Sequence, residues 1–132
     1  MTTASPADGI VLFAEGLPGF EECREFVVLV SPETQPFTIL QGASPDGPSF
    51  VAIDPRLVDP AYDATLDAPT RARLSADEQS PLLWLAIVAS NDDGTATANL
   101  RAPVVINPGT MQGIQVIAVE SRYPVAHPLE AA

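Results

Sequence analysis

Side chains that could act as acids, bases, nucleophiles or metal ligands are few and scattered in this chain. His127 is the only histidine, and the acidic residue nearest to it in the sequence is Glu130. A histidine that serves as a general base needs a nucleophile and an orienting group within reach, and a metal site needs several ligands. The sequence groups nothing of this kind with His127 and therefore favours a structural role. A small enzyme that uses His127 with an Asp or Glu is the alternative.

The acidic clusters and the single cysteine are equally poor candidates for chemistry. Cys23 stands among Glu21, Glu22 and Glu25, whose carboxylates oppose formation of a thiolate. The run at 91–93 lacks the alternating ligand spacing of a calcium loop and fits a tight turn. No glycine pattern that cradles phosphates occurs in the sequence. The sequence therefore predicts no catalytic residue, no cofactor and no metal.

Net charge is the strongest compositional feature. Seventeen Asp and Glu face six arginines, no lysine occurs, and the formal net charge is −11. Phosphate backbones are bound by cationic side chains, so direct binding of DNA or RNA is not expected. The same charge would speed the encounter with a basic protein, or it would simply keep the chain soluble. Composition alone does not separate these two roles.

Neither membrane attachment nor export is predicted. The longest apolar run, Leu82–Ala89, is far shorter than the roughly 18–20 residues that span a bilayer, and it suits a buried strand. Met1–Gly9 has neither the basic start nor the apolar middle of a secretory signal. A cytoplasmic protein is expected, with a single domain over residues 10–129 and loose ends at 1–9 and 130–132.

Short apolar segments between fourteen prolines predict an all-β protein. Each segment has about the length of a strand, and turn residues bound most of them. The predicted strands are Ile10–Phe13, Glu25–Val30, Pro36–Leu40, Ser49–Asp54, Leu82–Ser90, Thr95–Ala102, Val104–Asn107 and Ile114–Ser121. One short helix is predicted, at Asp67–Gln79, within a proline-rich excursion from the sheet at 45–81.

Two turn signals organise the C-terminal half. The Asp-Gly within 90–95 and the Asn-Pro-Gly within 107–113 each join two predicted strands. The last three or four strands are therefore expected to form an antiparallel meander. Within it Ala96, Ala98 and Leu100 alternate with polar residues and should face a core. The two alanines leave room for a bulky neighbour, for which Trp84 is the candidate.

Four stretches, in this order and at these intervals, resemble the bacterial flagellar assembly factor FliW family. They are GLPGFEECREFVVL at 16–29, FVAIDP at 50–55, TANLRAPVVIN at 97–107 and GIQVIAVESRYPVAHPL at 113–129. The resemblance covers residues 10–129, and TANLRAPVVIN is its most specific piece. Residues 60–81 match poorly, and Ala126 stands where family members often carry an Arg before the His-Pro pair.

The resemblance implies a regulatory binding protein with a small antiparallel β-barrel-like domain. Members of this family bind flagellin in the cytoplasm. Once flagellin is exported, the released protein binds the carbon storage regulator CsrA, a dimeric RNA-binding protein, and relieves its repression of flagellin mRNA. The terminal segments of flagellin are apolar and helical, which implies an apolar groove or sheet edge that holds them. The RNA-binding regulator implies a second surface, of acidic character. A flagellin-binding chaperone or assembly component without the translational role is the alternative.

The hypothesis assigns residues to these roles. Partner binding through acidic side chains is placed on Glu21, Glu22, Glu25 and Asp54. The family motifs are interpreted as mainly structural, because turn formation and backbone hydrogen bonds explain their residue types without a ligand. These motif residues are Leu17, Pro18, Gly19, Phe20, Thr97, Asn99, Pro103, Ile106, Asn107 and His127.

Replacing both Glu21 and Glu22 with Lys should weaken binding of the basic regulator and change how its affinity depends on salt, because two attractive charges become repulsive. Thermal stability should stay nearly unchanged, since exposed charges contribute little to it. Titrations of the regulator at several salt concentrations test this prediction. An affinity that is unaltered at every salt concentration would remove both residues from the interface.

Overall fold

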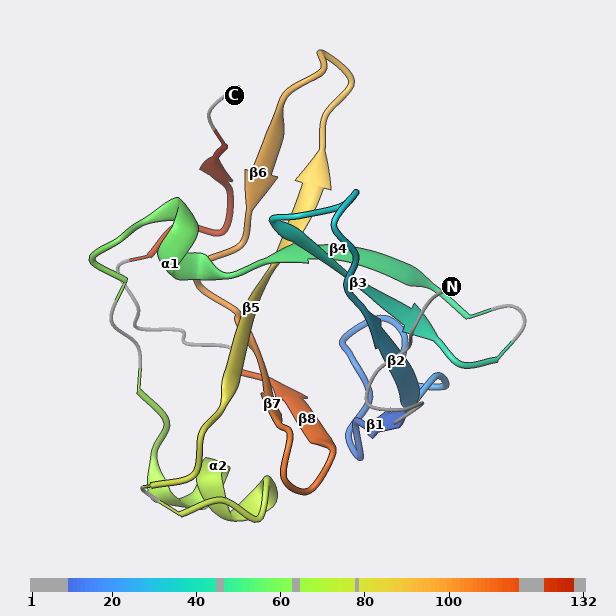
Figure 1. Cartoon of the computed structure of the whole chain (residues 1–132), viewed down its shortest axis with the longest axis vertical. Helices are drawn as coiled ribbons and strands as arrows, with labels where there is room; N and C mark the ends of the chain where they lie inside the picture. The colour runs from blue at the N-terminus through green and yellow to red at the C-terminus, as the bar shows by residue number, and fades with distance from the viewer. Residues whose placement is uncertain (1–9, 45–46, 63–64, 78, 117–122, 130–132) are drawn as a thin grey trace.

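The computed structural model describes residues 10–44, 47–62, 65–77, 79–116 and 123–129 (Figure 1). The predicted loose ends at 1–9 and 130–132, and most of the predicted strand Ile114–Ser121, lie outside these residues. The strands are β1 Ile10–Leu12, β2 Glu25–Leu29, β3 Phe37–Gly42, β4 Ser49–Ile53, β5 Leu83–Ser90, β6 Ala96–Ala98, β7 Val104–Asn107, β8 Gln112–Gln115 and β9 His127–Pro128. The helices are α1 Pro55–Val58 and α2 Ala68–Arg73.

Seven of these strands close into a barrel. They follow the order β4-β3-β2-β1-β8-β7-β5, and β5 pairs back to β4. Every neighbouring pair is antiparallel except β1 and β8, which run parallel where Leu12 meets Gln112. The all-β, barrel-like fold class is confirmed. The two remaining strands, β6 and β9, form an arm on the edge of β5.

Alternation along the strands fills the barrel with apolar side chains. Phe13 and Phe26 meet edge to face with ring centroids 5.4 Å apart. Gly113 passes so close to Phe13 that a Cβ added to it would lie 2.6 Å from the ring, which explains the glycine at this point of β8. The buried residues of this interior are Val11, Phe13, Leu17, Phe26, Leu40, Ala52, Leu85, Val104 and Ile106.

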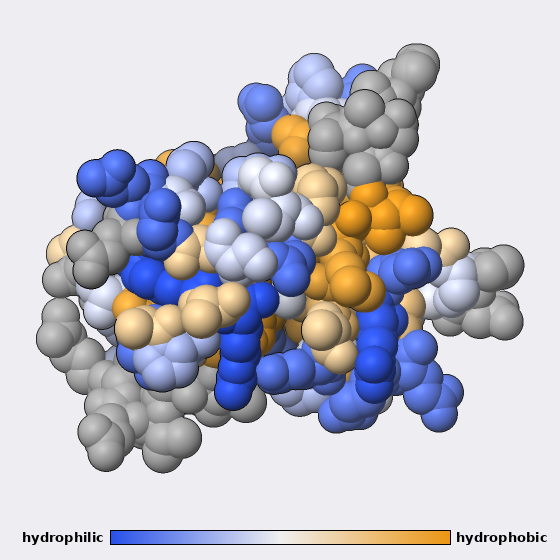
Figure 2. All heavy atoms as spheres, turned by 90° about the horizontal axis from the view of Figure 1, so that it is seen from below, coloured by the Kyte–Doolittle hydropathy of each residue, from blue (hydrophilic) through white to orange (hydrophobic). Residues whose placement is uncertain are grey.

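Two excursions cover part of the outer face of the barrel. The segment around α1 and the C-terminal residues 123–129 pack over Ile53, Ala86 and Ala98, and the segment around α2 packs over Val105 and Ile114. On β1, by contrast, Ile10 and Leu12 are exposed. Figure 2 shows apolar atoms on the right-hand side of the view, the side where β1–β4 lie in Figure 1. The two excursions therefore cover one part of the outer face of the barrel, while the part around β1 keeps apolar side chains exposed to solvent.

The predicted number of helices is wrong, because the structure has a second short helix, α1, directly after β4. The Asp54 carboxylate accepts a hydrogen bond from the Arg56 N–H at 2.9 Å, and Pro55 occupies the first helical position. An Asp-Pro pair suits a helix start as well as a turn, so the sequence did not distinguish them. The predicted helix at 67–79 exists only as α2, and Ser75 just beyond it has a φ of 55°.

The two predicted hairpins are confirmed, but the continuous meander is wrong. β5 pairs with β6 through Val88–Ser90 and with β7 through Leu83–Leu85, so β6 and β7 are not neighbours in the sheet. Ala98 and Leu100 are buried as predicted. The residue opposite Ala98 is Val88, while Trp84 packs at the margin of the same cluster. The predicted strand Thr95–Ala102 ends at Ala98.

Asn107 should contribute measurably to stability, because its buried side chain joins two loops. Its Nδ2 donates to the Leu74 carbonyl at 2.8 Å and its Oδ1 accepts from the Gly109 N–H at 2.9 Å. Asn107→Ala should lower the free energy of unfolding by about 1–3 kcal/mol in urea titrations. Asn91→Ala, in an exposed turn, is the matched control and should change it by less than about 0.5 kcal/mol. Equal effects of the two changes would contradict the assignment.

Candidate partner-binding site

The site begins at a branch in the sheet. One edge of β5 pairs with β7 near its start and with β6 near its end, and Asn99 lies where the two partners separate. The Asn99 N–H donates to the Ile87 carbonyl at 2.9 Å, and its Oδ1 accepts from the N–H groups of Arg101 and Ala102, both at 3.1 Å. These bonds end β6 and direct the chain toward β7. The two strands diverge from β5, and this leaves space between them.

A turn at 17–20 faces this branch from the other side of the barrel mouth. The Phe20 N–H donates to the Leu17 carbonyl at 2.7 Å, and Gly19 has a φ of 87°, in the region that favours glycine. Leu17 is buried in the barrel interior, whereas the Phe20 side chain is 44% exposed. Its ring meets Phe50 edge to face, with centroids 5.2 Å apart. The turn therefore holds an exposed aromatic ring in a defined place.

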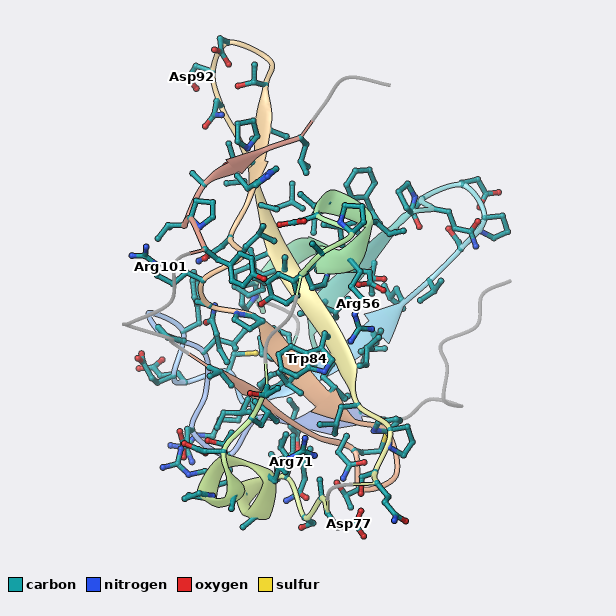
Figure 3. All side chains as sticks on the ribbon, turned by 90° about the vertical axis from the view of Figure 1, so that its left-hand side faces the viewer. Arg56, Arg71, Asp77, Trp84, Asp92 and Arg101 are labelled. Atoms are coloured by element: carbon teal, nitrogen blue, oxygen red, sulfur yellow. The ribbon has the colours of Figure 1, made fainter. Side chains whose placement is uncertain are left out.

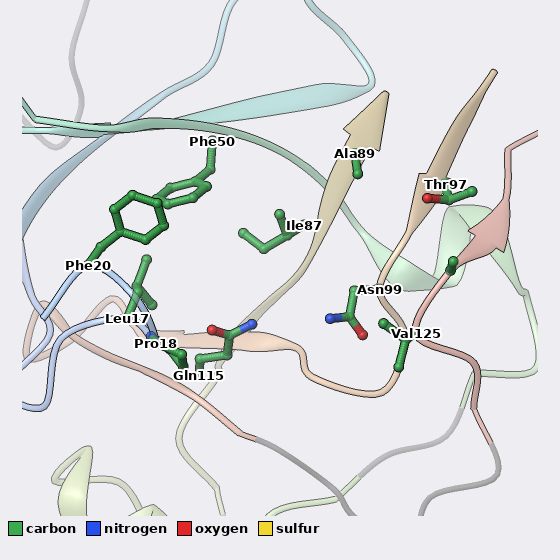
Figure 4. A pocket seen from close by; sticks show the side chains of 11 residues that line it. Leu17, Pro18, Phe20, Phe50, Ile87, Ala89, Thr97, Asn99, Gln115 and Val125 are labelled. Carbon is green, nitrogen blue, oxygen red and sulfur yellow. The ribbon is translucent and has the colours of Figure 1, made fainter. Parts of the chain in front are cut away.

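An apolar hollow of about 340 Å³ lies between the turn and the branch (Figure 4). Its polar groups are Thr97, Asn99 and Gln115, and the Gln115 amide donates to the Ala102 carbonyl at 3.0 Å. Among the described residues that line it, none is an acid, a base or a cysteine. The lining consists of Leu17, Pro18, Phe20, Phe50, Ile87, Ala89, Thr97, Asn99, Gln115, Val125 and Ala126. The hollow is thus suited to holding apolar groups rather than to acid–base chemistry.

The C-terminal residues 123–129 form one wall of the apolar hollow. Arg101 Nε donates to the Tyr123 carbonyl at 2.8 Å, and the Leu100 N–H donates to the Pro124 carbonyl at 3.1 Å. β9 then pairs with β6, with His127 opposite Ala98. His127 Nδ1 lies 2.9 Å from the carbonyl oxygen of Pro128. Ala126, where the family resemblance leads one to expect Arg, lies on the apolar hollow itself.

The other side of the branch is closed by aromatic side chains. The Tyr62 hydroxyl donates to the Leu100 carbonyl at 3.0 Å, and its ring centroid lies 4.6 Å from that of Tyr123. Burial, reinforced by Tyr123, raises the pKa of Tyr62 to about 12. Tyr62 therefore stays neutral at physiological pH and serves to fix the branch. Figure 3 shows the arm reaching beyond the barrel to Asp92 at its tip.

A second, acidic hollow of about 540 Å³ adjoins the turn at 17–20. It is lined by Gly19, Phe20, Glu21, Glu22, Cys23, Ser44, Gly47 and Pro48. Both carboxylate side chains are exposed, and one oxygen of Glu21 accepts from the Gly19 N–H at 3.1 Å. Phe20 lines both hollows, so the apolar and the acidic hollow adjoin at this residue.

The structure groups three of the four acidic candidates. Glu21 and Glu22 lie just before β2 and Glu25 is its first residue, and Glu22 and Glu25 together line a third, smaller hollow. Asp54 lies elsewhere. It follows Ile53, which pairs with Phe37 at one end of β3, whereas Phe26 pairs with Gly42 at the other end. Asp54 caps α1 and is not part of the acidic hollow.

Of the motif residues, five line the apolar hollow: Leu17, Pro18, Phe20, Thr97 and Asn99. Pro103 and Ile106 are buried and Asn107 stabilises the β7–β8 hairpin. Sequence reasoning missed the walls supplied by Phe50, Ile87, Ala89, Gln115 and Val125. The alternation of side chains along β5 could have predicted that Ile87 and Ala89 face inward with Leu85. It could not have predicted that they lie at the mouth of a barrel.

In the part of the chain that the structure describes, no group of three or more His, Cys, Asp or Glu side chains could hold a metal ion. Within the same residues, no helix is long and apolar enough to cross a membrane.

Comparisons with known proteins agree on one family. The model of the FliW protein family matches residues 2–129. The flagellar assembly factor FliW of Geobacillus kaustophilus is 38% identical over 121 residues, which are 91% of this chain and 83% of the relative. That of Caldanaerobacter subterraneus subsp. tengcongensis is 34% identical over 124 residues, 92% of this chain and 83% of the relative. A crystal structure of the flagellar assembly factor FliW has a TM-score of 0.85 at 33% identity and covers 100% of this chain and 92% of that chain.

Arg101→Gln should loosen the C-terminal wall of the apolar hollow, because the hydrogen bond from Arg101 Nε to Tyr123 is lost. The amides of Leu100 and Leu129, which donate to Pro124 and Ala96, should then exchange hydrogen faster. Hydrogen exchange followed by NMR or mass spectrometry measures this. Arg56→Gln, an exposed change on α1, is the control. Unchanged protection of both amides in the Arg101 variant would show that the wall does not depend on Arg101.

Proposed function

Because the chain belongs to the FliW family of flagellar assembly factors, we propose that it is a cytoplasmic binding protein without catalytic activity that acts through two protein partners. It binds flagellin before export. When flagellin has left, it binds the carbon storage regulator CsrA and relieves repression of flagellin mRNA. It binds neither nucleic acid directly nor a membrane.

The apolar hollow is the observation that carries the flagellin part of the proposal. It lies at the barrel mouth, and motif residues far apart in the sequence, from Leu17 to Asn99, converge on it. Its walls belong to strands and hydrogen-bonded turns, which makes the hollow preformed. An amphipathic helix that lays its apolar side chains into such a groove would be held without any charged contact.

The acidic hollow supports the proposal that CsrA is the second partner. A protein that binds RNA must present cationic groups to phosphates. The exposed Glu21 and Glu22, within a chain of net charge −11, would attract such a surface and speed its encounter. A docked acidic protein also places negative potential near the path of the RNA and so disfavours RNA binding.

The direct test is titration calorimetry of the purified chain with monomeric flagellin and, separately, with CsrA. Binding of each at micromolar concentration or tighter is expected. Binding of flagellin alone would favour the chaperone alternative, and binding of neither would overturn the proposal. His127→Ala should keep both affinities within a few-fold, because His127 has no catalytic part in this account. Loss of all function in that variant would instead favour the enzyme alternative.

Val125→Asp should weaken flagellin binding by roughly tenfold or more, because it places a carboxylate on the wall of the apolar hollow, where a bound segment would have to desolvate it. Val30→Asp is a closely matched control, since the two valines are 55% and 56% exposed and Val30 lies outside the hollow. Calorimetric titration of both variants with flagellin is the measurement. Equal loss in the two variants would remove the hollow from the interface.

A further inference from the structure

The contact between β1 and β8, here called the seam, is the shortest ladder in the barrel. One pair of residues, Leu12 and Gln112, is in register across it, whereas every other pair of neighbouring barrel strands is in register over at least three residues. The Leu12 N–H donates to the Met111 carbonyl at 2.9 Å. The next amide, that of Phe13, donates instead to the Arg24 carbonyl at 2.7 Å, on the side of β2. β1 is therefore bonded to β2 over its whole length and to β8 at one point.

The closed seam also has two unfavourable features. Met111, directly before β8, has a φ of 56°, in the left-handed region that is costly for a residue with a side chain. Within the part of the chain that the structure describes, Gln112 Oε1 is a buried oxygen without a hydrogen-bond partner, which carries a desolvation cost. Separation of the two strands would let water reach this oxygen. Opening of the seam therefore recovers part of its own cost.

Packing and one ion pair hold the seam together in place of a longer ladder. The Phe13 ring packs directly against Gly113 of β8. Arg73 Nη1, on α2, lies 3.0 Å from Glu15 Oε2, in the loop that follows β1. Both of these side chains are more than half exposed, so salt screens the pair and it contributes little to stability. Local opening favours elements with few backbone hydrogen bonds, and in this barrel that element is the seam.

The seam runs into the apolar hollow. Leu17 and Pro18, which follow β1, line the hollow from one side of the seam, and Gln115, on β8, lines it from the other (Figure 4). The Gly16 N–H donates to the Phe13 carbonyl at 2.8 Å, which ties the turn at 17–20 to the end of β1. A movement of β1 away from β8 would therefore carry this turn along and widen the hollow.

The volume of the hollow limits what can enter it while the seam is closed. About 340 Å³ is near the lower end of the roughly 300–1,000 Å³ that ligand pockets have. An amphipathic helix presents anchors at positions i, i+3 or i+4 and i+7, which spread over roughly 10 Å along its axis. A wider hollow would accept more of these side chains.

We propose that the seam is a gate. β1 and the turn at 17–20 separate from β8 as one unit, with the β1–β2 ladder intact, and the widened hollow admits an apolar segment of the partner. This inference rests on the proposed function, in which that segment belongs to flagellin. The preformed hollow takes the first apolar side chains, and opening of the seam lets further ones follow.

Hydrogen exchange of the free protein tests the opening without any partner. The Leu12 amide, which bridges the seam, should have a protection factor at least tenfold lower than the amides of Phe13 and Gly42. The Phe13 amide bonds to the β2 side, and the Gly42 amide donates to the Pro48 carbonyl at 2.7 Å beside the β3–β4 pair. Equal protection of the three amides would overturn the gate.

Gln112→Leu should slow exchange of the Leu12 amide severalfold, because it removes the buried oxygen that has no partner and so favours the closed seam. Gln41→Leu is the matched control on β3, where the Gln41 amide donates to the Gly42 carbonyl at 3.2 Å. It should leave exchange at Leu12 unchanged. Thermal unfolding checks that both variants are folded. Unchanged exchange at Leu12 in the Gln112 variant would contradict this account of the seam.

A disulfide across the seam tests whether binding needs the gate. Leu12→Cys with Gln112→Cys, in a Cys23→Ser background, places two thiols in register on neighbouring strands. Such strands lie roughly 4.8 Å apart, within the roughly 4.4–6.8 Å between Cα atoms that a disulfide spans. The oxidised form should bind flagellin at least tenfold more weakly than the reduced form of the same protein. Calorimetric titration in the two redox states measures this.

The control lock is Gln41→Cys with Ser49→Cys in the same background, which joins β3 to β4 away from the seam. Its oxidised and reduced forms should bind flagellin alike. Equal flagellin affinity of the oxidised and reduced seam variants would overturn the gate and leave the proposed function standing. If the wild-type chain does not bind flagellin at all, the proposed function fails, and hydrogen exchange of the free protein still decides whether the seam opens.

Discussion

A backbone edge can form only one set of ladder hydrogen bonds, and this constraint on β5 shapes the rest of the molecule. The edge of β5 opposite β4 pairs with β7 near the start of the strand and with β6 near its end. β7 belongs to the barrel, and β6 does not. The sheet must therefore divide near Ile87. Asn99 satisfies the backbone groups at the division, where buried donors left without partners would be costly.

The apolar hollow follows from that division. Where β6 and β7 part, the inward-facing side of β5 is left open at the barrel mouth, and Ile87 and Ala89 line the hollow there. The turn at 17–20 and the C-terminal residues 123–129 complete the walls without closing the space. Since Phe20 belongs to this turn and Glu21 and Glu22 follow it directly in the chain, the apolar and acidic hollows are adjacent.

Local features of this fold could be predicted from the sequence, whereas features that depend on closure could not. The turn residues Asp93-Gly94 and Asn107-Pro108-Gly109 predict the two hairpins, and the alternation at Ala98 and Leu100 predicts a buried face. The parallel contact of β1 with β8 joins residues 100 apart in the sequence, and the pairing of β5 with β4 joins residues 33 to 37 apart, and no local sequence pattern predicts either pairing. The candidate site was only partly predictable for the same reason: the acidic group at 21–25 is contiguous in the sequence, but Phe50, Gln115 and Val125 meet at the hollow only after the barrel has closed.

The central claim is that the surface created by the division of the sheet is where partners dock. The most direct measurement is the hydrogen-exchange footprint of flagellin on the chain, compared between the bound and unbound protein. The account predicts slower exchange in the turn at 17–20, in β5 at 87–89 and at 97–99 around Asn99. Protection confined to the outer faces of β1–β3, with these three segments unchanged, would contradict it.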